Sequence, residues 1–195
     1  MIRMSEAVLP GHPDKFCDAV AEAIVEECYT VDERAYCQVE MSVWCDQVFL
    51  TGGIATRKPL PRPLEEIVKE VGRNIGYVAP NCIEADRYQV QDHVCKLDKD
   101  PREWTDHVND QCIAIGWAGY DQKVDYLPPE HWLVLRLKDE LFASCKAGRL
   151  KGQGPDGKVL VRVRENTDDW HVEHILVTLQ QLPDIGFVSF TGLVM

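Results

Sequence analysis

The stretch SEAVLPGHPDKFCDAVAEAI, residues 5–24, joins a glycine- and proline-containing turn to the start of an amphipathic segment. From Pro13 onward the apolar side chains of Phe16, Val20 and Ile24 recur every fourth residue, a spacing typical of one buried helix face. Proline suits the first position of a helix, where the amide hydrogen that it lacks would have no partner. The stretch therefore predicts a helix over roughly 13–29.

Strand and helix patterns alternate in the rest of the chain. Polar and apolar residues alternate in YCQVEMSVWC and QVFLTGGIAT (36–45 and 47–56), which predicts two strands paired as a hairpin. Helical spacing predicts two more helices, over roughly 63–75 and 129–147. This order predicts an α+β fold, in which helices cover one face of mostly antiparallel sheets. Further strands are predicted in RYQVQDHV, QCIAIGWAGY, KVLVRVREN and HVEHILVTLQQ (87–94, 111–120, 158–166 and 171–181), and a loop in KGQGPDGK (151–158).

The composition is that of an ordinary globular chain, since 45% of its 195 residues are hydrophobic and 27% are charged. Its formal net charge of −11 argues against nucleic acid or an anionic membrane as the main partner, because both require a basic face. The sequence contains no uninterrupted run of about 18 apolar residues, so we expect no membrane span. The eight cysteines stand singly, without the close pairing of zinc sites, which favours free thiols in a reducing cytoplasm.

The start of the first predicted helix has the features of an anion site. Unpaired backbone amides and the helix dipole create local positive potential there, to which Lys15 adds a cation. His12 can donate a hydrogen bond to a bridging or leaving oxygen, and Asp14 can hold a divalent cation that itself binds phosphate. Together these groups favour a nucleoside triphosphate site. Residue types alone leave open an alternative, in which they only cap the helix, complement its dipole and face solvent.

The opening stretch closely resembles the N-terminal signature of S-adenosylmethionine synthetases (methionine adenosyltransferases), in which a Ser-Glu pair precedes Gly-His-Pro-Asp-Lys. The resemblance implies pseudo-symmetric sheet-plus-helix units, with a first synthetase-like region at 1–110 and a second, truncated one at 111–195. It also implies that flat sheet faces form a large apolar subunit interface. The similarity continues in the family's order through VEMSV, LTGGIAT, EEIVKEVGRNIGY, NDQCIAIGWAGYD, GRLKGQGPDGKVLVRV and ILVTLQQ.

The resemblance implies a reaction in which the methionine sulfur attacks C5′ of ATP and expels the triphosphate, which is then hydrolysed to phosphate and pyrophosphate. His12 and Lys158 match the family's catalytic groups beside the triphosphate. Glu6, Lys15 and Asp156 match residues that contact the nucleotide and its phosphates. ATP and methionine are therefore the expected small-molecule partners.

The resemblance also implies metal and amino-acid contacts. Asp14 matches a magnesium ligand, Glu40 matches a glutamate associated with a potassium ion, and Asp110 matches an acid that contacts the methionine amino group across a subunit interface. The expected cofactors are thus Mg²⁺ and K⁺. For Glu40, Asp110, Asp156 and Lys158, residue types alone equally allow solvated charges in turns or at strand edges.

Two positions on the methionine side depart from the family's pattern. Ile54 stands where the family has a glutamate that contributes to methionine recognition, and Leu97 stands where a glutamine is expected. In addition, HVNDQC (107–112) replaces a glycine-rich GAGDQG stretch. These changes remove polar groups and alter the backbone freedom near Asp110.

The chain is also about half as long as family members. The resemblance then implies a hetero-oligomeric, split enzyme, in which a second chain supplies the adenine platform and the basic phosphate loop of the C-terminal half. Retention of GHPDK favours this interpretation, and the apolar ending GFVSFTGLVM (186–195) favours tight association. One alternative, favoured by Ile54 and Leu97, is a non-catalytic regulatory or interaction subunit. A fragment, or a nucleotide-binding protein with other chemistry, also stays open.

Overall fold

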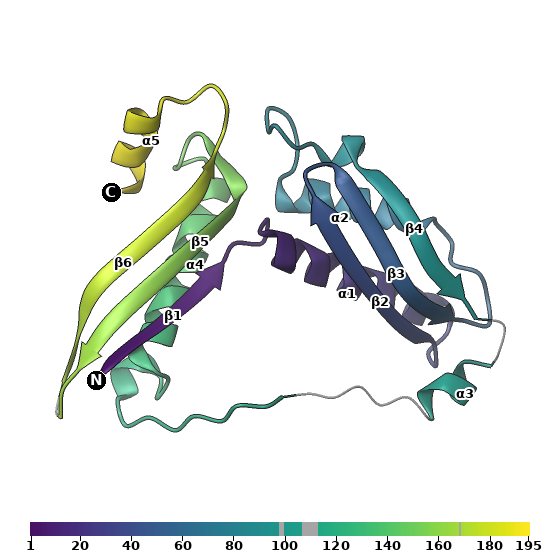
Figure 1. Cartoon of the computed structure of the whole chain (residues 1–195), viewed down its shortest axis with the longest axis horizontal. Coiled ribbons are helices and arrows are strands. Elements are labelled where there is room, and N and C mark those ends of the chain that lie inside the picture. The colour runs from purple at the N-terminus through teal and green to yellow at the C-terminus, as the bar shows by residue number, and fades with distance from the viewer. Residues whose placement is uncertain (98–99, 107–112, 168) are drawn as a thin grey trace. The chain divides into compact units, whose positions relative to one another are not determined.

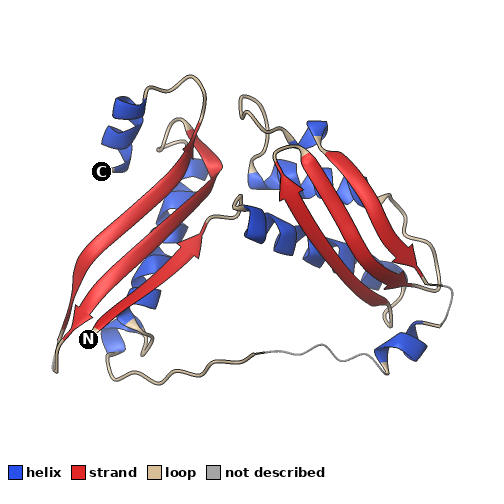
Figure 2. Ribbon diagram, viewed as in Figure 1, coloured by secondary structure: helices blue, strands red, loops and turns tan. Residues whose placement is uncertain are grey.

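The structure is a computed structural model that describes residues 1–97, 100–106, 113–167 and 169–195. Its contacts divide the chain into two compact units. We call Pro13–Cys112 the continuous unit, and Met1–His12 with Ile113–Met195 the discontinuous unit. Each unit contains a three-stranded sheet with at least one helix packed against it (Figure 2). This architecture confirms the predicted α+β class built from sheet-plus-helix units.

The continuous unit places two helices on one face of its sheet (Figure 1). Its elements are α1 (Pro13–Val31), β2 (Tyr36–Trp44), β3 (Gln47–Ala55), α2 (Leu64–Ile75), the 3₁₀ turn η1 (Ala85–Arg87), β4 (Gln89–Lys96) and α3 (Pro101–Thr105). The strand order is β2-β3-β4, with β2 and β3 antiparallel and β3 and β4 parallel. The predicted hairpin is confirmed, and α2 lies in the crossover that a parallel pair requires.

The core of the continuous unit fixes the position of α1. Phe16, Val20 and Ile24 are at most 1% exposed, as their spacing predicts. Phe16 also contacts the rings of Tyr77 and Tyr88, with centroids 5.9 and 5.5 Å away. Because burying each large apolar side chain contributes about 1.5–3 kcal/mol, this face holds the start of the helix firmly in place.

The discontinuous unit has β5 as its central strand, antiparallel to both neighbours. Its elements are β1 (Ile2–Val8), the 3₁₀ turn η2 (Gln122–Val124), α4 (Pro129–Lys146), β5 (Gln153–Glu165), β6 (Trp170–Gln181) and α5 (Phe187–Val194). Every second residue of this part of β5 is a fully buried valine: Val159, Val161 and Val163 are 0% exposed. They form a core cluster with Val134 of α4. The alternation therefore turns one sheet face toward the helix.

Most predicted elements agree with the structure within a few residues. The helices expected over 63–75 and 129–147 are α2 and α4, and the strands expected over 87–94, 158–166 and 171–181 correspond to β4, β5 and β6. The division into synthetase-like regions 1–110 and 111–195 stays a prediction. The compact units are defined by contacts within this chain, and by that criterion β1 belongs with the C-terminal part, because it joins the sheet of β5 and β6.

Two local predictions are wrong. The strand expected over 111–120 does not form within the described residues 113–119, which pair with no strand of either sheet and in which Ile113 and Ile115 are 90% and 91% exposed. Residues 111 and 112 lie outside the described residues. The loop expected over 151–158 is largely strand, because β5 already begins at Gln153 and pairs there with Gln181. None of the helices described has the length and apolar character to cross a membrane.

Candidate functional site

Backbone pairing brings the two motifs of the predicted nucleotide site together. The antiparallel contact between β1 and β5 continues past Val8 into the turn that follows. The N–H of Leu9 donates to the carbonyl of Gly157 at 2.8 Å, and the N–H of Gly11 donates to the carbonyl of Pro155 at 3.1 Å. A Cβ on Gly11 would lie 2.5 Å from the Pro155 carbonyl carbon. Only glycine therefore permits this approach.

His12 follows this contact and lines an open hollow of about 520 Å³ together with Asp156 and Lys158. The hollow is completed by Gly157 and by residues 178–180 of β6. The Nζ atom of Lys158 also lies 3.3 Å from Oε1 of Glu6, and both side chains are partly exposed. Exposed ion pairs of this kind are weak, so Lys158 can exchange Glu6 for an anionic ligand. Glu6, His12, Asp156 and Lys158 thus form one connected group.

Asp156 is the electrostatically unusual member of this group. Burial raises the pKa of its carboxyl, while the nearby His12 imidazole and the N–H of Gly157 partly oppose that rise. A half-buried carboxylate is costly to keep charged unless a donor satisfies it. The hollow therefore combines two nitrogen donors, on His12 and Lys158, with an acceptor that gains from a ligand hydroxyl or cation. This set suits a polyanion that carries a hydroxyl-bearing group.

Asp14 and Lys15 belong to the continuous unit, at the first turn of α1. The helix begins at Pro13, as predicted, and both side chains are exposed. The Nζ atom of Lys15 donates to Oδ2 of Asp18 at 2.9 Å, and this hydrogen bond, reinforced by the charge of Asp18, raises the pKa of Lys15. Lys15 therefore stays protonated, and its exposed ammonium group is suited to contact a phosphate.

The remaining predicted site residues do not join that group. Glu40 is exposed in β2, opposite Thr51 of β3, which in turn lies opposite His93 of β4. Asp110 lies outside the described residues. Across the ranges that the structure describes, no group of three or more His, Cys, Asp or Glu side chains is placed to hold a metal ion.

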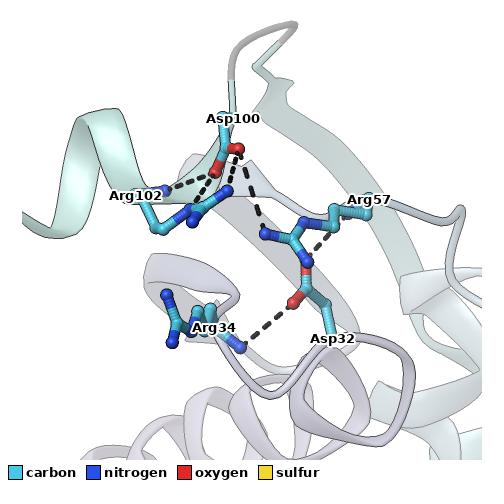
Figure 3. A network of polar contacts seen from close by, with 5 residues as sticks. All are labelled: Asp32, Arg34, Arg57, Asp100 and Arg102. Carbon is cyan, nitrogen blue, oxygen red and sulfur yellow. Dashed lines mark hydrogen bonds and ion pairs between the residues drawn. The ribbon is translucent and has the colours of Figure 1, made fainter.

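A polar network in the continuous unit is a feature that the sequence analysis missed (Figure 3). The carboxylate of Asp32 accepts hydrogen bonds from the backbone N–H groups of Arg34 and Arg57, each at 3.0 Å, and these bonds lower its pKa. The guanidinium of Arg57 lies 3.9 Å from the carboxylate of Asp100, which also accepts from Arg102 and caps α3. No short sequence motif predicts this network, because its members come from three separate turns.

A second cavity, also missed, lies in the continuous unit. It has a volume of about 570 Å³ and is lined by the end of β3, the segment 56–64 and the C-terminal part of β4 with Leu97. Ile54 and Leu97, the two positions that depart from the family's pattern, both line it, and the N–H of Leu97 donates to the carbonyl of Ile54 at 2.9 Å. The substituted positions are therefore neighbours in one pocket.

Comparison with known proteins assigns the family. Residues 1–98 match the model of the S-adenosylmethionine synthetase N-terminal domain, which is half of the chain. The chain therefore belongs to the S-adenosylmethionine synthetase family.

Relatives in three bacteria extend the similarity beyond that domain. The chain is 27% identical to the S-adenosylmethionine synthase of Bifidobacterium adolescentis, over 93% of this chain and 50% of the relative. It is 27% identical to that of Mycoplasma capricolum, over 95% of this chain and 49% of the relative, and 28% identical to that of Borreliella afzelii, over 93% and 49%. The chain thus spans about half the length of the curated relatives that it matches.

Proposed function

We propose that this chain forms the triphosphate-binding part of a split methionine adenosyltransferase, which makes S-adenosylmethionine from ATP and methionine with a second chain. The observation that carries the proposal is the hollow that His12, Asp156 and Lys158 line together, with Glu6 in contact with Lys158. These residues lie about 150 positions apart in the sequence, and a purely structural subunit has no need to bring an imidazole and an ammonium to one open hollow.

The proposed chemistry is stabilisation of a leaving group. As the methionine sulfur attacks C5′, the C5′–O bond breaks and negative charge accumulates on the departing triphosphate oxygen. His12 donates a hydrogen bond to that oxygen, and Lys158 places a positive charge beside the phosphates once its contact with Glu6 is exchanged. Asp156 accepts a hydrogen bond from the nucleoside part. The contacts that His12 and Lys158 make strengthen as charge develops on the departing triphosphate, which is the condition for lowering the barrier.

The family uses Mg²⁺ and K⁺, and the residues present fit them to different degrees. Magnesium at phosphates needs only one or two protein carboxylates, so the exposed Asp14 fits a Mg²⁺ ion that a triphosphate holds jointly. Glu40 offers a potassium ion one carboxylate from this chain. When bound, such ions neutralise phosphate charge. We also propose a reducing cytoplasm as the compartment, since the described cysteines form no disulfide bond with one another.

The need for a second chain follows from the charge of the ligand. A departing triphosphate carries about four negative charges, and an incompletely neutralised polyanion makes a poor leaving group. Of the lysines that the resemblance assigns to the phosphates, this chain brings Lys15 in one compact unit and Lys158 in the other. The proposed partner supplies the remaining cations and the adenine platform from residues of the family's C-terminal half.

A regulatory or interaction subunit is the second candidate function. The observation that favours it is the apolar pair Ile54 and Leu97, which line one pocket where the family's pattern has a glutamate and a glutamine. A chain that no longer recognises methionine could still bind nucleotide or a catalytic subunit. The two candidates differ in whether His12 contributes to turnover.

Reconstitution separates the two candidates. The purified chain is incubated with ATP, methionine, Mg²⁺ and K⁺, and the S-adenosylmethionine formed is quantified. The same measurement is made after adding a second chain that carries the C-terminal half of one of the three bacterial synthases named above. The proposal predicts product only in the mixture, and a loss of about a hundredfold with His12→Ala, whereas the exposed control Lys151→Ala leaves turnover unchanged. Robust activity of the isolated chain contradicts the split enzyme, and full activity with His12→Ala supports the regulatory subunit.

A further inference from the structure

The pocket in the continuous unit has the size and lining of a small-molecule site. Its volume of about 570 Å³ falls within the range of roughly 300–1,000 Å³ that is usual for ligand pockets. Ile54, Leu60, Leu64, Val94 and Leu97 form its apolar surface. The pocket shares no residue with the hollow at His12.

One wall of this pocket is held in place by the surrounding structure. The segment RKPLPRP (57–63) contains three prolines, each of which restricts its own backbone. Its first residue, Arg57, donates its N–H to the buried carboxylate of Asp32 at 3.0 Å (Figure 3). Near its end, Arg62 binds the carboxylates of Glu27 and Glu70. A wall anchored at both ends costs little entropy to order when a ligand binds.

The polar lining is mostly basic, although the whole chain is acidic with a formal net charge of −11. Arg57, Lys58, Arg62 and Lys96 line the pocket, against the single carboxylate of Asp92, but Arg57 is already paired with Asp100, and Arg62 with Glu27 and Glu70. Within the described residues, Lys58 and Lys96 form no ion pair with a carboxylate. Concentrated positive charge at an apolar pocket selects ligands with an anionic group.

We propose that this pocket binds a small amphipathic anion, with an apolar body against Ile54 and Leu97 and a carboxylate or phosphate at Lys58 and Lys96. An amino-acid zwitterion fits less well, because its ammonium group would face cations and only Asp92 could receive it. That carboxylate already accepts the N–H of Val94 at 3.0 Å. The inference uses only residues of the continuous unit, and it bears on the choice between the two candidate functions, because Ile54 and Leu97 stand at positions where the family's pattern has methionine-side polar groups.

The test uses two fluorescent probes of similar shape and different charge. The full chain is titrated with 8-anilinonaphthalene-1-sulfonate, which is anionic, and with N-phenyl-1-naphthylamine, which is neutral. The double substitution Lys58→Gln/Lys96→Gln should weaken the anionic probe about tenfold and leave the neutral one unchanged, whereas the exposed control Lys151→Gln affects neither. Leu97→Gln should weaken both probes. Equal affinity of the anionic probe for the wild type and the double variant overturns the proposal.

Competition defines the ligand class. Octanoate or octyl phosphate should displace the anionic probe, and whichever binds more tightly identifies the head group. Octylamine and methionine at the same concentration should not displace it, and displacement by either to the same extent overturns the assignment. Magnesium tripolyphosphate, which reports on the hollow at His12, should bind the wild type and the double variant with equal affinity. A negative result for the pocket can therefore be told apart from a negative result for the hollow.

Discussion

Substituting Gly11 with alanine tests how the nucleotide site is assembled. The added Cβ would lie 2.5 Å from the carbonyl carbon of Pro155 and 2.6 Å from its oxygen. Carbon atoms in contact are normally about 3.5–4.0 Å apart, so one of the two backbones must move. That movement stretches the 3.1 Å hydrogen bond from the Gly11 N–H to the Pro155 carbonyl and separates His12 from Asp156.

The cost follows from two contributions. Overpacking typically costs about 1–3 kcal/mol, and loss of one hydrogen bond about 1 kcal/mol, so we expect a destabilisation of about 2–4 kcal/mol. Urea unfolding measures this cost. Titration with magnesium tripolyphosphate measures the loss of affinity that we expect when His12 and Asp156 move apart. The matched control is Gly116→Ala, because nothing lies within 4 Å of that position. If Gly11→Ala matches the control in both assays, the close approach of the two motifs is not what assembles the site.

Three further substitutions or reactions follow from the electrostatics. Because burial raises the pKa of Asp156, its charged form costs stability above the unfolded pKa; Asp156→Asn should raise the urea midpoint at pH 8, and the gain should vanish toward pH 3. The pKa of Asp32 is lowered, so its effect on stability has the opposite sign: its stabilisation is full at neutral pH, and the urea midpoints of wild type and Asp32→Ala should begin to approach each other only as the pH falls below about 4. Alkylation followed by mass spectrometry should modify the exposed Cys45 well before Cys28, because the hydrogen bond with Cys37 and burial both raise the pKa of Cys28. Equal alkylation rates would contradict the packing of α1 on β2.

Local patterns predicted most of the fold because its elements obey them closely. The four-residue spacing of Phe16, Val20 and Ile24 matches a fully buried helix face, and the alternation in the first hairpin matches two paired strands. The segment 111–120 shows the limit of this reasoning. Its alternation predicts a strand, but a strand needs a neighbour to pair with, and in this chain the described part of the segment has none.

The site was harder to predict from residues alone. The resemblance pointed to Glu6, His12, Asp156 and Lys158, yet their proximity depends on β1 pairing with β5 across most of the chain, which no local pattern encodes. The network of Asp32 and the pocket behind Ile54 were missed for the same reason. Their members come from separate turns, and each is an unremarkable charge or apolar residue in the sequence. Such arrangements become visible only when the strands are in register.

The most direct test of the account is whether the hollow at His12 and Lys158 holds a triphosphate. Isothermal titration of the purified chain with magnesium tripolyphosphate measures this without a partner chain. We expect saturable binding that His12→Ala and Lys158→Ala each weaken about tenfold, while the exposed control Lys151→Ala leaves it unchanged. The absence of binding by the wild type, or equal affinity in all four proteins, would contradict the assignment of this hollow as the triphosphate site.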